Sequence, residues 1–134
     1  MTGYILENSG LIEKRNIMNK KDLENRLIEF SVSIAQWVDS AGKHPVIIHL
    51  RDQIIRSGTA PALNYAEAQS AESKRDFIHK LGIVLKELRE TQVNLRIIRR
   101  LMPNNDPEVE KLLRENDELL AIFHTTIMTA KSRL

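Results

Sequence analysis

The residues that could carry chemistry in this chain are its histidines, its acids and its isolated glycines. A di-metal centre in a helical bundle uses Glu-x-x-His pairs that project inward, and the chain contains none. Cysteine is absent, no Ser or Thr lies in a recognised nucleophile motif, and Gly58 and Gly82 are too isolated for a phosphate-binding loop. Glu67 and Glu72 are close in sequence, but carboxylates alone do not make an acid–base pair. We therefore expect no catalytic residue, no metal, no cofactor and no enzymatic activity.

Positive charge gathers in the middle of the chain. Residues 51–100 hold 10 Lys and Arg against 6 Asp and Glu, whereas residues 101–134 hold 4 against 6. A row of cations on the outer face of one predicted helix fits phosphate contact, which is salt-sensitive and independent of base sequence. The alternative is a solvated face whose charge is balanced by Glu87 and Glu90. The predicted nucleic-acid-binding residues are Lys86, Arg89, Arg96, Arg99 and Arg100.

These cations need a helix to position them, and apolar spacings of four and three predict one over residues 73–102. The same period predicts three more helices, over residues 19–41, from Pro45 to about residue 70, and from Asp106 onward. Asn19, Ser73 and Asp106 have the side chains of helix N-caps. Four helices with short connections predict an all-α, antiparallel up-down four-helix bundle. Residues 19–134 form this domain, and residues 1–18 are expected to be a flexible extension.

The second helix carries two local features of its own. Pro61 removes a backbone donor, so we expect the helix to be kinked near this residue or broken into two pieces. The surrounding residues 57–62 are small, which predicts the close approach of a neighbouring helix.

The apolar residues that recur at spacings of four and three form one stripe along each predicted helix. Some other apolar residues fall outside these four stripes. A wide core stripe accounts for them, or they form a second face that packs against copies of the chain. We favour self-association, because two helices show this face independently. The predicted oligomer interface is Ile28, Val32, Ile83, Val93 and Ile97.

Composition bounds the remaining properties. The chain has 134 residues, a net charge of +2 and a hydrophobic content of 42%, which suits one globular domain. No apolar run approaches the roughly 20 residues that span a bilayer, so we expect no membrane partner. The absence of cysteine and of a secretory leader leads us to expect a cytoplasmic protein.

Three segments of the chain resemble the bacterial four-helix bundle proteins encoded in intervening sequences of large-subunit ribosomal RNA genes. They are residues 56–68 (RSGTAPALNYAEA), 72–77 (ESKRDF) and 81–91 (LGIVLKELRET). This family is also similar to the accessory variability determinant of diversity-generating retroelements. The resemblance implies a homopentamer that binds RNA or DNA and a reverse transcriptase. The chain departs from its relatives at Asn94, where they often carry an aromatic residue, and in residues 1–17, which precede the usual start.

The polar residues of this motif allow two interpretations. Arg56, Asn64, Glu67 and Arg75 could form a structural polar network around the kinked helix, where freed backbone groups need partners. The alternative is an active or binding site. We favour the structural network.

Together these patterns predict a non-catalytic, homo-oligomeric bundle that acts as a nucleic-acid-binding adaptor. The alternative is a protein–protein interaction scaffold that does not bind nucleic acid.

Overall fold

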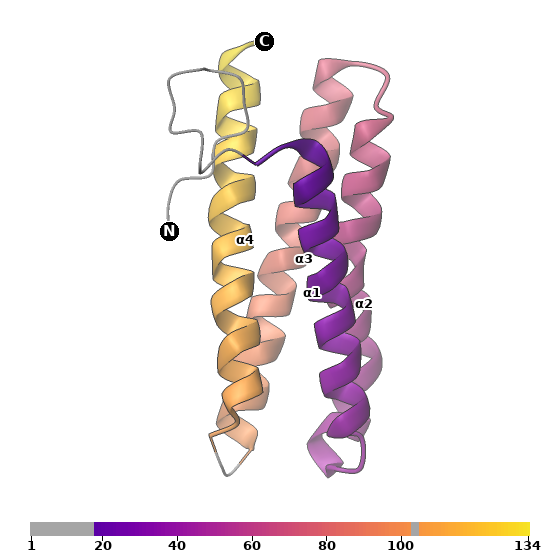
Figure 1. The fold of residues 1–134 in the computed structure, drawn as a ribbon, viewed down its shortest axis with the longest axis vertical. Helices are drawn as coiled ribbons and strands as arrows, with labels where there is room; N and C mark the ends of the chain where they lie inside the picture. Colours follow the sequence, from indigo (N-terminus) through magenta and orange to yellow (C-terminus); the bar gives the residue numbers. More distant parts are fainter. Residues whose placement is uncertain (1–17, 103–104) are drawn as a thin grey trace.

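The computed structural model describes residues 18–102 and 105–134, and the regular secondary structure in these ranges is entirely α-helical. In chain order the helices are α1 (Lys20–Ser40), α2 (Pro45–Gln69), α3 (Lys74–Leu101) and α4 (Pro107–Ser132). Figure 1 shows that successive helices run in opposite directions. The predicted all-α, antiparallel up-down four-helix bundle is therefore confirmed. The flexible extension predicted for residues 1–18 lies outside the described residues, except for Met18, which packs against the core.

Each helix begins at a side chain that accepts a hydrogen bond from the backbone of its own first turn. In Ser73, for example, Oγ accepts from the amide of Asp76 at 3.0 Å. Such caps satisfy donors that have no partner within the helix. Three of the four were predicted from the sequence, and only His44 was not. The caps are Asn19, His44, Ser73 and Asp106.

The bundle buries one stripe of each helix in a common core. Leu27, Ile54, Leu88 and Phe123 show the pattern, because each has no more than 2% of its surface exposed. Close packing joins α1 to α2, α2 to α3 and α3 to α4, whereas α1 and α4 make far fewer contacts. The helices α1 and α3 therefore lie diagonally across the bundle. The buried stripe of α4 is wide, since it includes Leu112, Leu119 and Ile122 as well as Leu113 and Phe123.

Ion pairs connect α1 to α4 along the side where they pack least. Arg26 meets Glu115 through two bonds, Nε to Oε2 at 2.6 Å and Nη2 to Oε1 at 2.8 Å. Its Nη2 also donates to Glu118 Oε1 at 2.6 Å. A bidentate arginine–carboxylate pair fixes both the distance between the two side chains and their relative orientation. The pair of Arg26 and Glu115 therefore limits how far α1 can move from α4.

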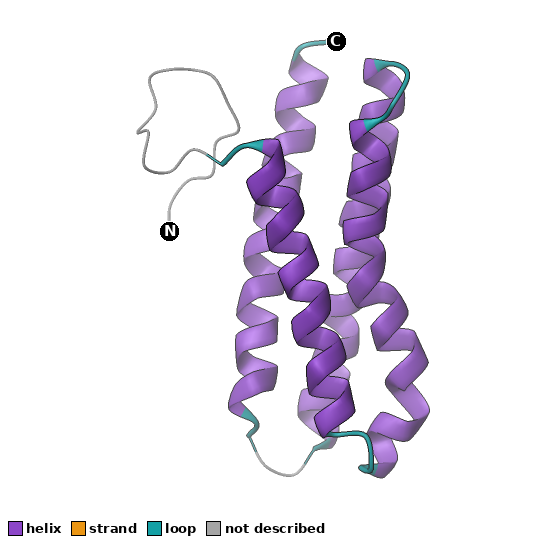
Figure 2. Cartoon of the chain, turned by 45° about the vertical axis from the view of Figure 1, so that its right-hand side comes forward, coloured by secondary structure: helices purple, strands orange, loops and turns teal. Residues whose placement is uncertain are grey.

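Helix α2 continues through Pro61 as one element and curves along its length in Figure 2. Pro61 has no N–H, which leaves the carbonyl of Ser57 without its usual helical donor. The next carbonyl, that of Gly58, lies 3.2 Å from the hydroxyl of Ser31 on α1. The predicted close approach is also confirmed, because a Cβ on Gly58 would lie 3.0 Å from Cγ2 of Ile34.

Candidate interaction surfaces on α1 and α3

Four exposed cations form a row along the outer side of α3. Lys86 and Arg100 stand seven residues before and after Val93, so the helical period places all three nearly in line. Arg89 lies four residues before Val93 and Arg96 lies three residues after it. At these spacings both side chains are rotated from the line of Val93 toward α4. Within the described residues none of these four cations forms an ion pair.

The fifth predicted cation, Arg99, has a different environment. Its Nη1 lies 3.3 Å from Oε1 of Glu110 on α4. Gln92, seven residues earlier on the same side of α3, donates from Nε2 to Asp117 Oδ1 at 2.7 Å. This side of α3 therefore faces α4, and Arg99 is partly neutralised there.

Two of the predicted interface residues lie among the cations of α3. Val93 is 50% exposed and Ile97 is 41% exposed, so the apolar and basic residues of α3 share one surface. On α1, Ile28 and Val32 are each 42% exposed. Ile83 differs, because it is half-buried on the side of α3 that faces α2.

The exposed apolar residues therefore form two separate strips. We call Ile28, Val32 and Ala35 the α1 strip, and Val93 with Ile97 the α3 strip. Because α1 and α3 are diagonal in the bundle, the two strips face different sides of the molecule. One partner helix cannot cover both at once.

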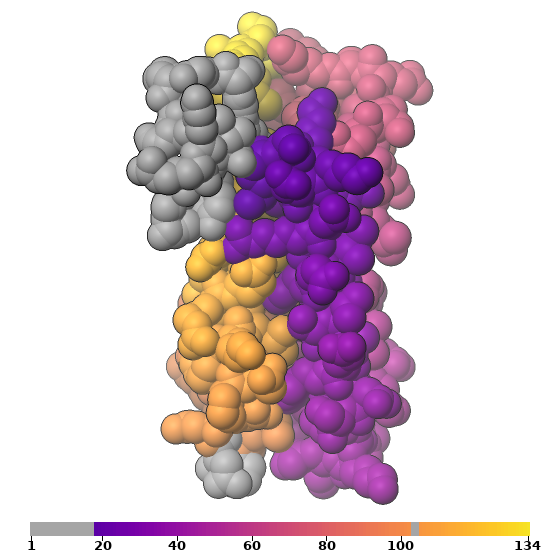
Figure 3. Space-filling view, viewed as in Figure 1, coloured from indigo at the N-terminus to yellow at the C-terminus, as the bar shows by residue number. Residues whose placement is uncertain are grey.

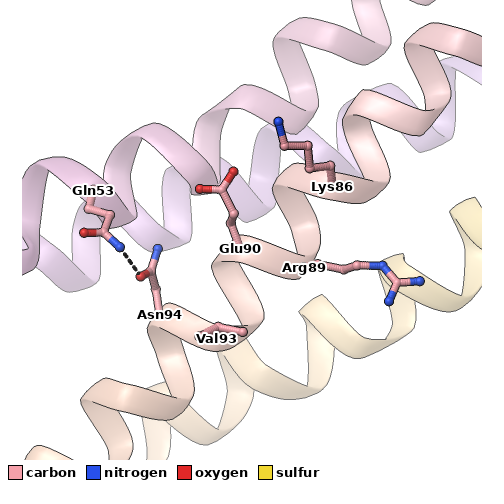
Figure 4. A pocket seen from close by; sticks show the side chains of 6 residues that line it. All are labelled: Gln53, Lys86, Arg89, Glu90, Val93 and Asn94. Atoms are coloured by element: carbon pink, nitrogen blue, oxygen red, sulfur yellow. Dashed lines mark hydrogen bonds between the residues drawn. The ribbon is translucent and has the colours of Figure 1, made fainter.

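A shallow hollow of about 360 Å³ adjoins the α3 strip, between α2 and α3. Figure 4 shows its lining, in which the side chains of Lys86 and Arg89 diverge and Gln53 reaches Asn94. Cations and amides suit the binding of an anionic or polar group. The hollow is open to solvent, and its one carboxylate, Glu90, is already paired with Arg56. The arrangement suits binding rather than acid–base chemistry.

Beside this hollow lies a polar cluster that the sequence interpretation did not identify, in which Ser57, Thr91 and Asn94 are buried and Gln53 is exposed. Gln53 Nε2 donates to Asn94 Oδ1 at 2.7 Å, and Asn94 Nδ2 donates to Ser57 Oγ at 3.1 Å. Thr91 Oγ1 lies 3.0 Å from Ser57 Oγ and 2.9 Å from the carbonyl of Glu87. The cluster joins α2 to α3 one turn before Pro61. Its sequence signal was the polar residues Ser57 and Thr91 within otherwise apolar stripes.

Arg56 does not bond to the other residues of the predicted polar network, and it forms ion pairs with α3 instead. Its Nη2 lies 2.6 Å from Glu90 Oε2 and its Nη1 lies 3.0 Å from Glu87 Oε1. Hydrogen bonds to Glu90 and then Glu87 raise the pKa of Arg56 above its already high value. The two carboxylates expected to balance the basic face of α3 are therefore both engaged by α2.

The other three residues of the predicted network do not join Arg56. Asn64 Nδ2 donates to the carbonyl of Ala60 at 3.1 Å, while Glu67 and Arg75 are exposed. No hydrogen bond or ion pair in the described ranges links any of the four to another. Glu67 lies on the same side of α2 as Arg56 but 11 residues further along, about 16 Å, and Arg75 lies on α3. A network that links all four side chains stays a prediction.

Tyr65 is the one motif residue with a buried ionisable group. Its ring packs edge-to-face on Phe123, with centroids 5.4 Å apart and an angle of 80° between the planes. Burial raises the pKa of Tyr65 to about 12, partly opposed by a hydrogen bond with Gln69. The hydroxyl therefore stays protonated at neutral pH and is unsuited to act as a base or nucleophile.

Metal ligands and membrane-spanning helices are both missing from the described residues. They contain no group of three or more His, Cys, Asp or Glu side chains that could hold a metal ion. None of their helices is both long and apolar enough to cross a membrane.

Comparison with protein families matches residues 19–125 to the 23S rRNA-intervening sequence proteins. The chain belongs to this family. The match covers all four helices apart from the end of α4. A search of curated proteins finds no match.

A solved structure has a similar fold. It is a crystal structure of a protein of unknown function from the S23 ribosomal protein family of Bacteroides thetaiotaomicron. The identity is 28%, the TM-score is 0.72, and the match covers 81% of this chain and 97% of the other. Family and fold therefore agree, and the family match includes α1 and α3, the helices that carry the α1 strip and the α3 strip.

Proposed function

We propose that the protein assembles with copies of itself, as a homopentamer, and acts without catalysis as a nucleic-acid-binding adaptor. The observation that carries this proposal is the pairing of Arg56 with Glu87 and Glu90. These acids could have balanced the basic face of α3, but α2 engages both. The cations Lys86, Arg89, Arg96 and Arg100 are left exposed and unpaired among the described residues, so phosphate is a suitable partner.

Self-assembly increases the electrostatic attraction. One chain has a net charge of +2, so five copies carry 5 × 2 = +10. A surface that repeats the α3 cations attracts a polyanion more strongly than one copy does. Membership of the 23S rRNA-intervening sequence family supports a ribosomal RNA context. The resemblance to the retroelement accessory protein supports a reverse transcriptase as the second partner of the adaptor.

One observation favours a second function, a protein–protein scaffold that binds no nucleic acid. Val93 and Ile97 are exposed among the cations, and a mixed apolar and basic surface also suits a protein partner. Binding of generic RNA separates the two functions, because a scaffold of this kind shows none.

The nucleic-acid test uses fluorescence anisotropy with a labelled, unstructured single-stranded RNA at several salt concentrations. We expect affinity to fall steeply as salt rises, since phosphate contacts release counterions. Arg89→Glu with Arg96→Glu should weaken binding at least about tenfold. The matched control, Lys20→Glu with Lys131→Glu, changes the net charge equally at exposed positions outside this face. Equal losses in both variants, or binding that ignores salt, would contradict the proposed surface.

The assembly test is light scattering over a range of protein concentrations. A pentamer has five times the 15.4 kDa mass of one chain. A particle with the mass of one chain at micromolar concentration contradicts self-assembly, whatever the RNA result.

A further inference from the structure

We infer that the α1 strip of one copy docks on the α3 strip of the next, with acidic residues of α1 facing basic residues of α3. This inference rests on the proposed self-assembly and names the surfaces that meet. Neither the family match nor the similar structure assigns them.

The two strips have the same apolar spacing. Ile28 and Val32 are four residues apart, as are Val93 and Ile97, so each pair repeats after about 6 Å of helix. All four side chains are 41–50% exposed in the single chain. Two helices with equal repeats can pack their exposed side chains into one another, which removes both strips from water.

The charges at the ends of the strips also match. Glu24 precedes Ile28 by four residues and Asp39 follows Val32 by seven, so acids stand on the α1 strip's side of the helix 15 residues apart. Lys86 and Arg100 bracket the α3 strip 14 residues apart. At about 1.5 Å per residue these separations are roughly 22 Å and 21 Å. One helix laid along the other can therefore place an acid near a cation at both ends.

These charged groups are available for a partner chain. Among the described residues none of the four enters an ion pair within its own bundle. The single cation of α1 between Glu24 and Asp39 is Arg26, and it is bound to Glu115 on the other side of the helix. From Glu24 to Asp39 the outer side of α1 therefore carries acids without a cation, and the exposed Lys21 lies beyond Glu24, seven residues before Ile28. The outer side of α3 is basic over the matching length, so a contact between these two stretches gains from opposite charges.

Contacts between identical strips are less favourable. Two α1 strips would bring Glu24 and Asp39 of one copy against the acids of the other, and two α3 strips would oppose cations. Like charges facing each other across an interface cost free energy. The complementary contact is heterologous, because it uses different surfaces on the two copies, and repetition of such a contact produces a closed ring or a filament.

The α3 cations divide by direction in this arrangement. Lys86 and Arg100 lie in line with Val93 and belong to the seam between copies. Arg89 and Arg96 turn toward α4 and lie beside the seam, where they remain accessible to phosphate. This division allows the assembly contact and the nucleic-acid contact to be changed separately.

The test is a charge exchange followed by sedimentation velocity over a range of concentrations. The acid-reversed variant is Glu24→Lys with Asp39→Lys, and the base-reversed variant is Lys86→Glu with Arg100→Glu. We expect each to self-associate at least about tenfold more weakly than the native chain. The exchange variant, which carries all four substitutions, should return to within about threefold of native association. Lys20→Glu with Lys131→Glu changes the net charge as the base-reversed variant does, so it is the matched control for that variant and should assemble like the native chain.

The possible results separate the inferred pairing of the two strips from the proposed self-assembly. An exchange variant as dissociated as either parent overturns the inferred pairing, and so do reversed variants that assemble normally. If the native chain is still an oligomer in either case, the proposed function stands. If the native chain is a monomer, both the proposed self-assembly and the inferred pairing are contradicted. Helicity is measured by circular dichroism for every variant. If a reversed variant is poorly helical, Val93→Gln replaces it, and unweakened association of Val93→Gln counts against the pairing.

Discussion

Nε1 of Trp37 donates a hydrogen bond to Oδ2 of Asp106, with the two atoms 3.0 Å apart. The other carboxylate oxygen, Oδ1, accepts from the amide of Glu108 at 2.9 Å and caps α4. One side chain thus begins α4 and attaches it to the end of α1. The contact lies on the side of the bundle where α1 and α4 otherwise pack little. The indole is 5% exposed, so water competes weakly for this bond.

Replacing Asp106 with Ala removes both interactions. We expect the free energy of unfolding to fall by about 1–3 kcal/mol, because a helix cap is lost and a buried indole N–H loses its acceptor. Asp106→Asn keeps an oxygen for the cap but presents an amide donor to the indole, so its loss should be smaller. Urea unfolding followed by fluorescence of the chain's one tryptophan measures both variants. Equal stability of the Ala and Asn variants contradicts the double role.

Two glycines in helices provide a matched pair with opposite expected effects. A Cβ at Gly58 lies 3.0 and 3.1 Å from Cγ2 and Cγ1 of Ile34, whereas a Cβ at Gly82 meets nothing within 4 Å. Gly82→Ala should stabilise the protein by about 1 kcal/mol through helix propensity. Gly58→Ala gains the same propensity but forces α1 and α2 apart, so it should destabilise by about 1–3 kcal/mol. Thermal unfolding measures both, and a rise in Tm for Gly58→Ala contradicts the close approach.

Arg56 should influence nucleic-acid binding without contacting the nucleic acid. Arg56→Gln releases Glu87 and Glu90 beside the α3 cations, so we expect RNA affinity to fall several-fold at low salt. The free energy of unfolding should change little, since Arg56 is exposed and its ion pairs are screened by solvent. Arg51→Gln is the control, because it removes one exposed positive charge from a residue that forms no ion pair within residues 18–102 and 105–134. Equal loss of RNA affinity in the two variants shows that net charge alone matters.

Tyr65 predicts a stability loss in strong alkali. Its folded pKa of about 12 lies above the ordinary value of 10.0, so the fold favours the protonated hydroxyl. This contribution is complete below pH 10 and is lost as pH rises through the window from 10 to 12, because the unfolded chain ionises first. Tyr65→Phe keeps the ring and cannot ionise. The stability difference between native protein and Tyr65→Phe should shift against the native chain across this window, and a constant difference contradicts the buried hydroxyl.

The sequence alone determined the four helices, three of their caps and the bundle they form. These features depend on short-range rules, which are the helical period of the stripes and the side chains at Asn19, Ser73 and Asp106. The close approach at Gly58 was also predictable, because small residues leave only one way to fill that space. The outer rows of cations and apolar residues followed from the same period.

Only the tertiary structure determined which of these side chains are paired, buried or exposed. Arg56 meets Glu87 and Glu90, Asn94 is buried in a polar cluster, and Ile83 is half-buried against α2. Each outcome depends on how α2 and α3 are rotated about their axes relative to one another. The helical period predicts where a residue lies around its own helix. Which residues of two helices meet depends on the packing of the whole core, and this cannot be predicted from spacing within one helix.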